Sequence, residues 1–269
     1  MLSARTMSAT LLVSKYMTRA VRTLDADAKL AEAHRLLREH SFSALVVTGR
    51  DGRPAGVISR TDLLRVGRSS GRQGRSLPLL ELPDQAVRAV MSAPAASIGE
   101  EATLREAAGT MLRHRYHRLV VLDAKGHLAG VLSTKDLMAA VHDQHAGVAV
   151  GDFMTAPALT VDALDTVAHA TDKLTEAHVA GLVVLEDERP VGMFTQTEAL
   201  QARDEPSTTP VGEVMSYAML CLDRKVQLRR AAGHALTTRA RRIVVVDHRE
   251  VCGVVTGMDF ARALLAGDG

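Results

Sequence analysis

The sequence is poor in aromatic and cysteine side chains. Its 269 residues include no Trp, three Tyr, four Phe and two Cys. So few rings argue against a stacking platform for single-stranded nucleic acid. Cys221 and Cys252 cannot build a disulfide framework in a chain of this length. The formal charge is only +2, from 33 Lys and Arg against 31 Asp and Glu, which excludes a strongly basic surface for coating nucleic acid.

Long apolar runs are also missing. The longest, such as 181–185 and 243–246, have the length of a strand and fall far short of the roughly 20 residues that a membrane span requires. The apolar patch within the first 17 residues is too short for a signal peptide. With only two cysteines and no sign of a disulfide framework, these features predict a cytoplasmic protein that does not cross a membrane.

One segment occurs four times along the chain. Each copy opens on a methionine and closes on Gly, two apolar residues, Ser or Thr, two further residues and an acid, as in GVISRTD, GVLSTKD, GMFTQTE and GVVTGMD. By subtraction, the opening methionine and the closing glycine are 39, 39, 38 and 38 residues apart. Such regular spacing indicates a repeat architecture. The pairs are Met17 and Gly56, Met91 and Gly130, Met154 and Gly192, and Met215 and Gly253.

Each copy predicts the same order of elements, namely strand, helix, strand, strand, helix. In the first copy, Leu30, Ala33 and Leu37 recur at helical spacing, and the aliphatic runs in LVVTGRDGRPAGVIS surround a turn and indicate a hairpin. A unit this small buries too little apolar surface alone, so we expect the units to pair face to face. The predicted units are 8–66, 84–142, 147–203 and 208–267.

The segment 67–83 enlarges the first connection and is rich in Arg, Gly and Ser. Arg65, Arg68, Arg72 and Arg75 follow one another about a turn apart, with no acid between Asp62 and Glu81. This composition predicts a solvated linker. An arm that folds over an anion is the alternative.

A β-α-β-β-α unit that ends in this glycine motif resembles the cystathionine β-synthase (CBS) domain. The resemblance covers nearly the whole chain and implies an α/β fold of four CBS units. It pairs unit one with two and unit three with four into two Bateman modules, which stack as a disk. It also implies clefts for adenosine compounds such as AMP, ADP, ATP or S-adenosylmethionine. What lies outside the four units is too short for a catalytic domain.

The four closing motifs carry two interpretations. Ser or Thr followed three residues later by an acid is a helix capping box, and it also offers a carboxylate for ribose hydroxyls and a helix start for phosphate. Glu198 is one methylene longer than an aspartate, which weakens ribose binding in unit three. The motifs are Ser59 to Asp62, including Thr61; Ser133 to Asp136; Thr195 to Glu198, including Thr197; and Thr256 to Asp259.

Basic residues precede the hairpin in the even units only. His117 and Arg118 stand before the second unit's strand, where HRLVV resembles the phosphate-binding strand of the AMP-activated protein kinase gamma subunit. In that family, an even unit's basic pair binds the phosphate of a nucleotide whose ribose the preceding odd unit holds. The resemblance thus implies one complete site, with ribose on Ser59, Thr61 and Asp62 and phosphate on His117, Arg118 and Lys135.

The other clefts are less complete. Arg241 and Arg242 offer the second module a phosphate site opposite Glu198, but Met258 replaces the lysine. The clefts of Asp136 and Asp259 lack a basic partner and would be empty or hold a less negative ligand. Thr23 and Thr160, on the opening strands, are candidates for their rims or ordinary strand hydroxyls.

These observations predict a regulatory protein that binds an adenine nucleotide (AMP, ADP or ATP) between CBS units and signals occupancy to an unidentified protein partner. An S-adenosylmethionine sensor and a ligand-free scaffold for protein contacts are the alternatives. We expect no catalysis, no metal site and no binding to nucleic acid or membrane, because no nucleophile, ligand or basic-surface pattern is present. Pairing of two chains into a homodimer stays open.

Overall fold

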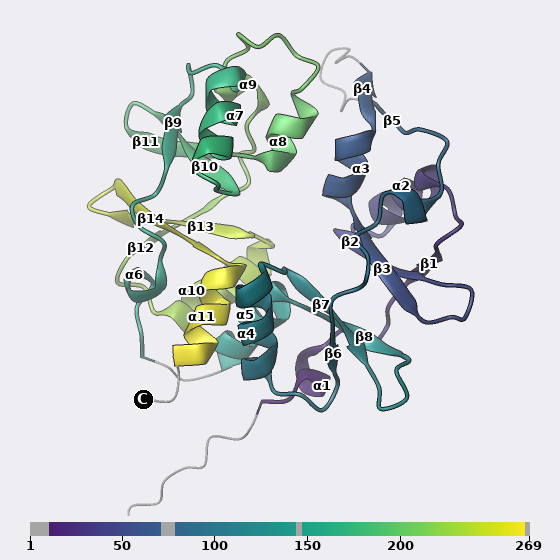
Figure 1. Cartoon of the computed structure of the whole chain (residues 1–269). Coiled ribbons are helices and arrows are strands. Elements are labelled where there is room, and N and C mark those ends of the chain that lie inside the picture. The colour runs from purple at the N-terminus through teal and green to yellow at the C-terminus, as the bar shows by residue number, and fades with distance from the viewer. Residues whose placement is uncertain (1–10, 71–78, 144–146, 267–269) are drawn as a thin grey trace, which may run out of the picture.

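The computed structural model describes residues 11–70, 79–143 and 147–266. Four three-stranded sheets, each with its own pair of helices, are arranged in a ring (Figure 1). Unit one lies at the upper right of that view, unit two at the lower right, unit three at the upper left and unit four at the lower left. The predicted α/β fold of four repeated units is confirmed.

Each unit has the predicted order of elements. The first strand is parallel to the second, and the second forms an antiparallel hairpin with the third. The units comprise β1 (Thr23–Asp25), α2 (Leu30–Glu39), β2 (Ala44–Thr48), β3 (Pro54–Ser59) and α3 (Arg60–Val66); β6 (Ser97–Gly99), α4 (Leu104–His114), β7 (Arg118–Leu122), β8 (Leu128–Ser133) and α5 (Thr134–Asp143); β9 (Thr160–Asp162), α7 (Val167–Glu176), β10 (Gly181–Glu186), β11 (Arg189–Thr195) and α8 (Gln196–Gln201); and β12 (Leu220–Asp223), α10 (Leu228–Thr238), β13 (Arg242–Asp247), β14 (Glu250–Thr256) and α11 (Gly257–Ala266).

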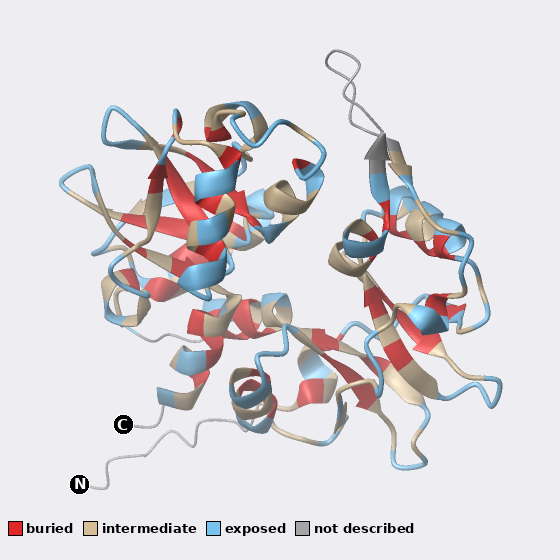
Figure 2. Cartoon of the chain, turned by 45° about the horizontal axis from the view of Figure 1, so that its top comes forward, coloured by how far each residue is buried: buried red, intermediate tan, exposed pale blue. Residues whose placement is uncertain are grey.

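The apolar residues that predicted the first helix do face the core. Leu30, Ala33 and Leu37 on α2 are completely buried, whereas the charged residues between them are exposed or half-buried. The central strand of every unit is buried over three successive aliphatic residues (Figure 2). Such strands are covered on both faces, because the unit's helices lie on one side and a neighbouring unit on the other.

A short leader precedes each unit and packs against the paired unit instead of its own. The leaders are α1 (Val13–Tyr16), the 3-10 helix η1 (Val87–Ala89), α6 (Val150–Phe153) and α9 (Val211–Val214), each followed closely by the repeat's methionine. Thr18 of the first leader bridges to Val131 in unit two, and Ser92 of the second bridges back to Val57 in unit one. The last two units exchange leaders in the same way through Thr155 with Val254 and Ser216 with Met193.

The repeated methionines and glycines meet across this exchange. A Cβ built on Gly130 would lie only 2.7 Å from Sδ of Met17, and one on Gly56 would lie 2.7 Å from Sδ of Met91. Gly192 and Gly253 are equally close to the methionine of the other unit's leader. The glycine of the motif is therefore needed for close approach of a swapped segment. The exchange joins units one and two into a first module and units three and four into a second.

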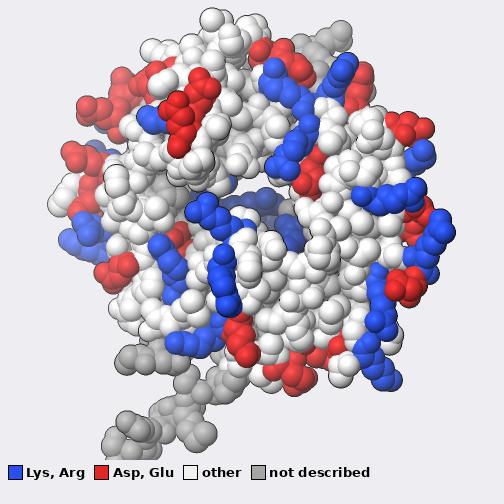
Figure 3. Space-filling view, viewed as in Figure 1, with Lys and Arg blue, Asp and Glu red and all other residues white. Residues whose placement is uncertain are grey.

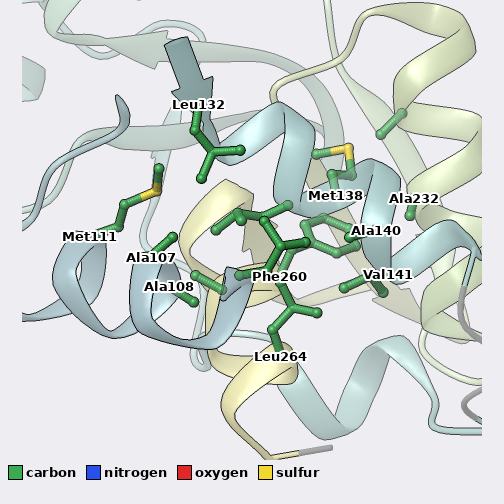
Figure 4. Packing of buried hydrophobic residues seen from close by; sticks show 14 of the residues in the cluster. Ala107, Ala108, Met111, Leu132, Met138, Ala140, Val141, Ala232, Phe260 and Leu264 are labelled. Atoms are coloured by element: carbon green, nitrogen blue, oxygen red, sulfur yellow. The ribbon is translucent and has the colours of Figure 1, made fainter. Parts of the chain in front are cut away.

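Units two and four hold the two modules together. Their helices α4, α5, α10 and α11 share one hydrophobic core, in which Phe260 and Ala140 are fully buried (Figure 4). Small residues such as Ala108 and Ala232 line the same core and let the helices approach closely.

Units one and three have separate cores, and they meet through α3 and α8. Arg203 donates a hydrogen bond to the carbonyl of Leu64 there, at 2.6 Å. Since α8 has no buried residue, this contact is much thinner than the one between units two and four.

The segment expected to be a linker forms a ribbon at its two ends. Strands β4 (Arg68–Ser70) and β5 (Leu79–Glu81) pair antiparallel, with Arg68 opposite Glu81. Arg72 and Arg75 lie outside the described residues, as do the ends of units one and four at 8–10 and 267. Over the described ranges, no helix has the length and apolar character needed to cross a bilayer.

Candidate functional site

The four closing motifs all form the helix cap that one of their two interpretations predicts. Asp62 accepts hydrogen bonds from N–H and Oγ of Ser59 at 2.8 and 2.6 Å, and Asp136 does the same with Ser133 at 2.6 and 2.7 Å. In each motif these bonds go to a single carboxylate oxygen, as they also do in Glu198 with Thr195 and Asp259 with Thr256. Capping therefore occupies one carboxylate oxygen, and a ligand can bind only where the second oxygen has no close protein partner.

The motifs differ in the partners of the second carboxylate oxygen. In Asp259, which is only 3% exposed, Oδ1 accepts from Thr155 Oγ1 at 3.2 Å and pairs closely with Arg262. Asp259 is thus fully occupied by protein groups. Among the described residues, Oδ1 of Asp62 has one loose ion pair, 3.6 Å from the exposed Arg65. Surface pairs of this kind contribute little energy, so this oxygen is open to a ligand.

Arg118 reaches from unit two to unit one. Its Nη2 donates to Oγ of Ser43 at 3.1 Å, and the carbonyl of Ser43 accepts from the N–H of Arg60. This chain of contacts brings the guanidinium to the start of α3, where Asp62 lies. Burial and the charge of Arg241 lower the pKa of Arg118, and Asp62 opposes that shift. The predicted ribose carboxylate and phosphate arginine are thus brought together.

The second module repeats the arrangement. Nη2 of Arg242 donates to the carbonyl of Ala180 at 3.1 Å, immediately before β10 of unit three. Burial lowers the pKa of Arg242, and the facing carboxylate of Glu198 opposes this. Gly181 leaves the space that the guanidinium fills, since an added Cβ would lie 3.3 Å from Nε of Arg242. Arg242 and Glu198 therefore face each other as Arg118 and Asp62 do.

The basic residues of both modules form one group. We call Arg60, His117, Arg118, Arg241 and Arg242 the central cluster. Burial lowers the pKa of Arg60, His117, Arg118 and Arg242, and the charge of Arg241 lowers it further in each of them. All five are therefore within electrostatic reach of one another. Figure 3 shows an opening near the middle of this face, with Lys and Arg atoms around and within it. A group so rich in cations and facing two carboxylates has the chemistry of an anion site.

His117 belongs to the central cluster, whereas the charge of Lys135 acts on Asp136. The carbonyl of His117 accepts from the N–H of Thr134, the first residue of α5, so β7 and the start of that helix are joined next to Lys135. Lys135 is exposed. Burial, followed by the charges of Arg118, Arg242 and Arg241, lowers the pKa of His117. These effects favour the neutral imidazole in the free protein.

Asp136 is partly buried and lies next to Lys135. Burial raises its pKa, against the hydrogen bonds from Ser133 and the charge of Lys135. The start of its helix touches that of α11, because a Cβ on Gly257 would lie 2.4 Å from Oγ1 of Thr134. Over the described ranges, Lys135 is the one cation whose charge acts on this carboxylate, so its surroundings favour a phosphate less than the central cluster does.

The remaining predicted residues lie at the sheet edges and helix starts. Thr23 begins β1 and is exposed; Thr160 begins β9 and is half-buried. Thr61 and Thr197 occupy the first turns of α3 and α8. Among the described residues, no three His, Cys, Asp or Glu side chains gather as metal ligands.

Sequence reasoning missed Arg60 and Ser43. Arg60 stands inside the motif of unit one, where the other units have Thr134, Gln196 and Gly257. A comparison of that position among the four repeats would have singled out the one cation. Ser43 gives no comparable signal, because a serine before a strand is common in loops.

The model of the CBS domain matches this chain four times, at residues 13–69, 87–143, 150–205 and 211–266. These matches take in most of the chain. Among curated proteins, the uncharacterized protein MJ1404 of Methanocaldococcus jannaschii is 26% identical over an alignment that covers 93% of this chain. The chain spans 61% of the length of that relative.

Two solved structures have the same fold over almost all of the chain. MJ1225 of Methanocaldococcus jannaschii, described as a proposed archaeal homologue of g-AMPK, superposes with a TM-score of 0.74 at 15% identity and covers 94% of this chain and 99% of its own. A conserved protein of Pyrococcus horikoshii reaches 0.67 at 19% identity, with 94% and 100% covered. These likenesses support the four-unit ring.

Proposed function

Since the chain belongs to the CBS-domain family, we propose that it is a regulatory protein that senses an adenine nucleotide at the central cluster. Some CBS-domain proteins have been solved in complex with AMP or ATP, so nucleotide binding occurs in this family. For this chain the nucleotide would be AMP, ADP or ATP. Its ribose hydroxyls would bind Asp62, and its phosphates would bind His117, Arg118 and Lys135.

The observation that carries the proposal is the reach of Arg118 across the cleft toward Asp62. An acceptor for hydroxyls and a donor for phosphate oxygens, one from each unit, match the two polar ends of a nucleoside phosphate. The cap explains one oxygen of Asp62 and leaves the other open. A purely structural cap gives no reason for Arg118 to lie among Arg60, Arg241 and His117, because like charges repel.

Arg241 and Arg242 extend the phosphate side toward the second module. Their charges act on residues of the first module, so an anion bound by one module also lies in the field of the other. A nucleotide would thereby favour one relative position of the two modules. A ligand shifts such an equilibrium only by its difference in affinity for the two states. Occupancy of the cluster would be signalled to a protein partner in this way.

Calorimetric titration with AMP, ADP, ATP and S-adenosylmethionine tests the proposal. We expect saturable binding of at least one adenine nucleotide, weakened about ten- to a hundredfold in Asp62→Ala and Arg118→Ala, as befits the loss of one charge-assisted hydrogen bond. The control is Asp259→Asn, because that carboxylate is already fully occupied by protein groups. Binding that is equally strong in all variants would contradict the proposal, and tight binding of S-adenosylmethionine alone would replace the ligand.

A further inference from the structure

A second group of cations lines a hollow away from the central cluster. Its volume is about 690 Å³, and we call it the α10 hollow after the helix that begins there. It lies where the end of α5 in unit two meets the turn between β12 and α10 in unit four. Its lining residues are His142, Asp223, Lys225, Val226, Gln227, Arg229 and Arg230.

Charge in the hollow is poorly balanced. Within the described residues, no acid forms an ion pair with Lys225, Arg229 or Arg230. The one carboxylate of the lining, on Asp223, accepts a hydrogen bond from the backbone N–H of Lys225 at 2.8 Å. By contrast Arg224, next to it in sequence, is paired with Asp247 at 3.2 Å.

These cations stand where the helix itself disfavours them. Arg229 and Arg230 occupy the first turn of α10, which has no acid and no side-chain cap. A cation costs free energy at the N-terminal end of a helix, because the backbone N–H groups give that end a positive potential. Arginines at the start of α10 therefore lower the stability of the helix. Residues that conflict with local stability in this way are expected at functional sites, and here the function indicated is binding.

The repeat supplies an internal comparison. Aligned on the first residue of the helix, Lys225, Gln227 and Arg230 of unit four correspond to Glu101, Thr103 and Glu106 of unit two. There Thr103 and Glu106 form a capping box, with bonds of 2.8 and 3.1 Å. Unit four has thus reversed both charges and lost the cap. Units one and three have no cation at either position, with Asp27 and Glu32 in one and Leu164 and His169 in the other.

His142 adds an imidazole from the other module. A carbonyl only accepts, so Nδ1 of His142 carries the proton in its 2.9 Å hydrogen bond with the carbonyl of Arg229. Gly233 makes this possible, since a Cβ there would lie 2.8 Å from Cε1 of the ring. The imidazole therefore lies against the backbone of α10.

We infer that the α10 hollow binds a small phosphorylated anion with two or more negative charges, held by Lys225, Arg229 and Arg230 with His142. Guanidinium groups suit phosphate oxygens because they donate in pairs, and an ammonium group adds a further charge-assisted bond. A hollow of this volume falls in the range of small-molecule sites. The bound anion joins α5 of the first module to α10 of the second.

Inorganic pyrophosphate in metal-free buffer is the probe, measured by calorimetry on the full chain. The main variant is Lys225→Glu, Gln227→Thr and Arg230→Glu, which copies unit two and restores the capping box. We expect pyrophosphate affinity to fall roughly tenfold or more, while the unfolding midpoint without ligand stays the same or rises. Lys225→Gln with Arg230→Gln is the second variant, in case the charge reversal disturbs folding. It is expected to lose affinity in the same direction.

Two controls identify where the probe binds. Arg22→Glu with Arg53→Glu makes the same change of charge at exposed positions of unit one and should leave pyrophosphate binding intact. Arg118→Ala with Arg242→Ala weakens the central cluster and should leave binding at the hollow. Loss in the α10 variants alone supports the inference. Binding unaffected by those variants, equal loss in the charge control, or no binding to the wild type would overturn it, whereas AMP titrations report on the central cluster separately.

Discussion

Replacing Gly130 by alanine tests whether the leaders are exchanged between units. The new Cβ would lie 2.7 Å from Sδ of Met17 and 2.9 Å from the carbonyl oxygen of Thr18. Both are closer than side-chain carbons normally approach, and the second is backbone that takes part in the bridge between Thr18 and Val131. Overpacking at such a site typically costs about 1–3 kcal/mol. We expect the free energy of unfolding to fall by about that amount.

Gly109→Ala is the matched control. Gly109 lies inside α4 of the same unit, and an added Cβ there meets no atom within 4 Å. Alanine in an exposed helix interior is more favourable than glycine by about 0.5–1 kcal/mol, so this variant should be slightly more stable. The same substitution thus has opposite signs at two glycines of one unit.

A double-mutant cycle with Met17→Ala identifies the partner. Denaturant unfolding would be measured for the wild type, both single variants and the double variant. If Met17 of the swapped leader occupies the space over Gly130, the cost of Gly130→Ala falls in the Met17→Ala background, although the contact with Thr18 remains. A Gly130→Ala protein as stable as the wild type, or a cost that is the same in both backgrounds, would refute the exchange.

Two further predictions concern pH. Burial and three arginines depress the pKa of His117, and a bound phosphate should raise it. AMP affinity should therefore strengthen as the pH falls from about 8 toward 5.5. The increase should be smaller in His117→Gln, and this variant also corrects for titration of the ligand itself. Burial raises the pKa of Asp136. The stabilisation that this side chain contributes is therefore present below the ordinary pKa of an aspartate, and it is lost as the pH rises through the higher pKa of the folded protein. Asp136→Asn should therefore be more stable than the wild type at pH 7 in urea unfolding, with a smaller difference near pH 4, and an Asn variant less stable at pH 7 would contradict this reasoning.

Periodicity was sufficient to predict the order of elements in every unit. Leu30, Ala33 and Leu37 repeat at helical spacing and are all buried on one face of α2. The constant interval between methionine and glycine predicted the repeat correctly. It did not predict that the two residues pack against each other across different units. A constant interval within a unit arises because each copy has both parts, but Met17 contacts Gly130 and not Gly56. A sequence interval carries no information on which copy a segment packs against.

The acids of the site show a similar limit. Asp62 and Asp259 have the same motif, and each has an arginine three residues later, at Arg65 and Arg262. Only Asp259 is closed, because Arg262 approaches it tightly and Thr155 of the swapped leader also donates to it. The two acids look alike in the sequence because Thr155, whose hydrogen bond distinguishes Asp259 from Asp62, is about a hundred positions from Asp259. By contrast the partnership of Asp62 with Arg118 followed from family resemblance.

The geometry of the ring determines where a nucleotide at the central cluster would act. Units two and four share a continuous core, so their relative position is stiff, whereas units one and three touch through α3 and α8. Asp62 and Glu198 lie in the first turns of those two helices, opposite Arg118 and Arg242. A phosphate that neutralises the arginines also changes the field on both helix starts. The thin contact between units one and three is therefore the part of the ring that the free energy of nucleotide binding can rearrange, because little packing opposes a change there.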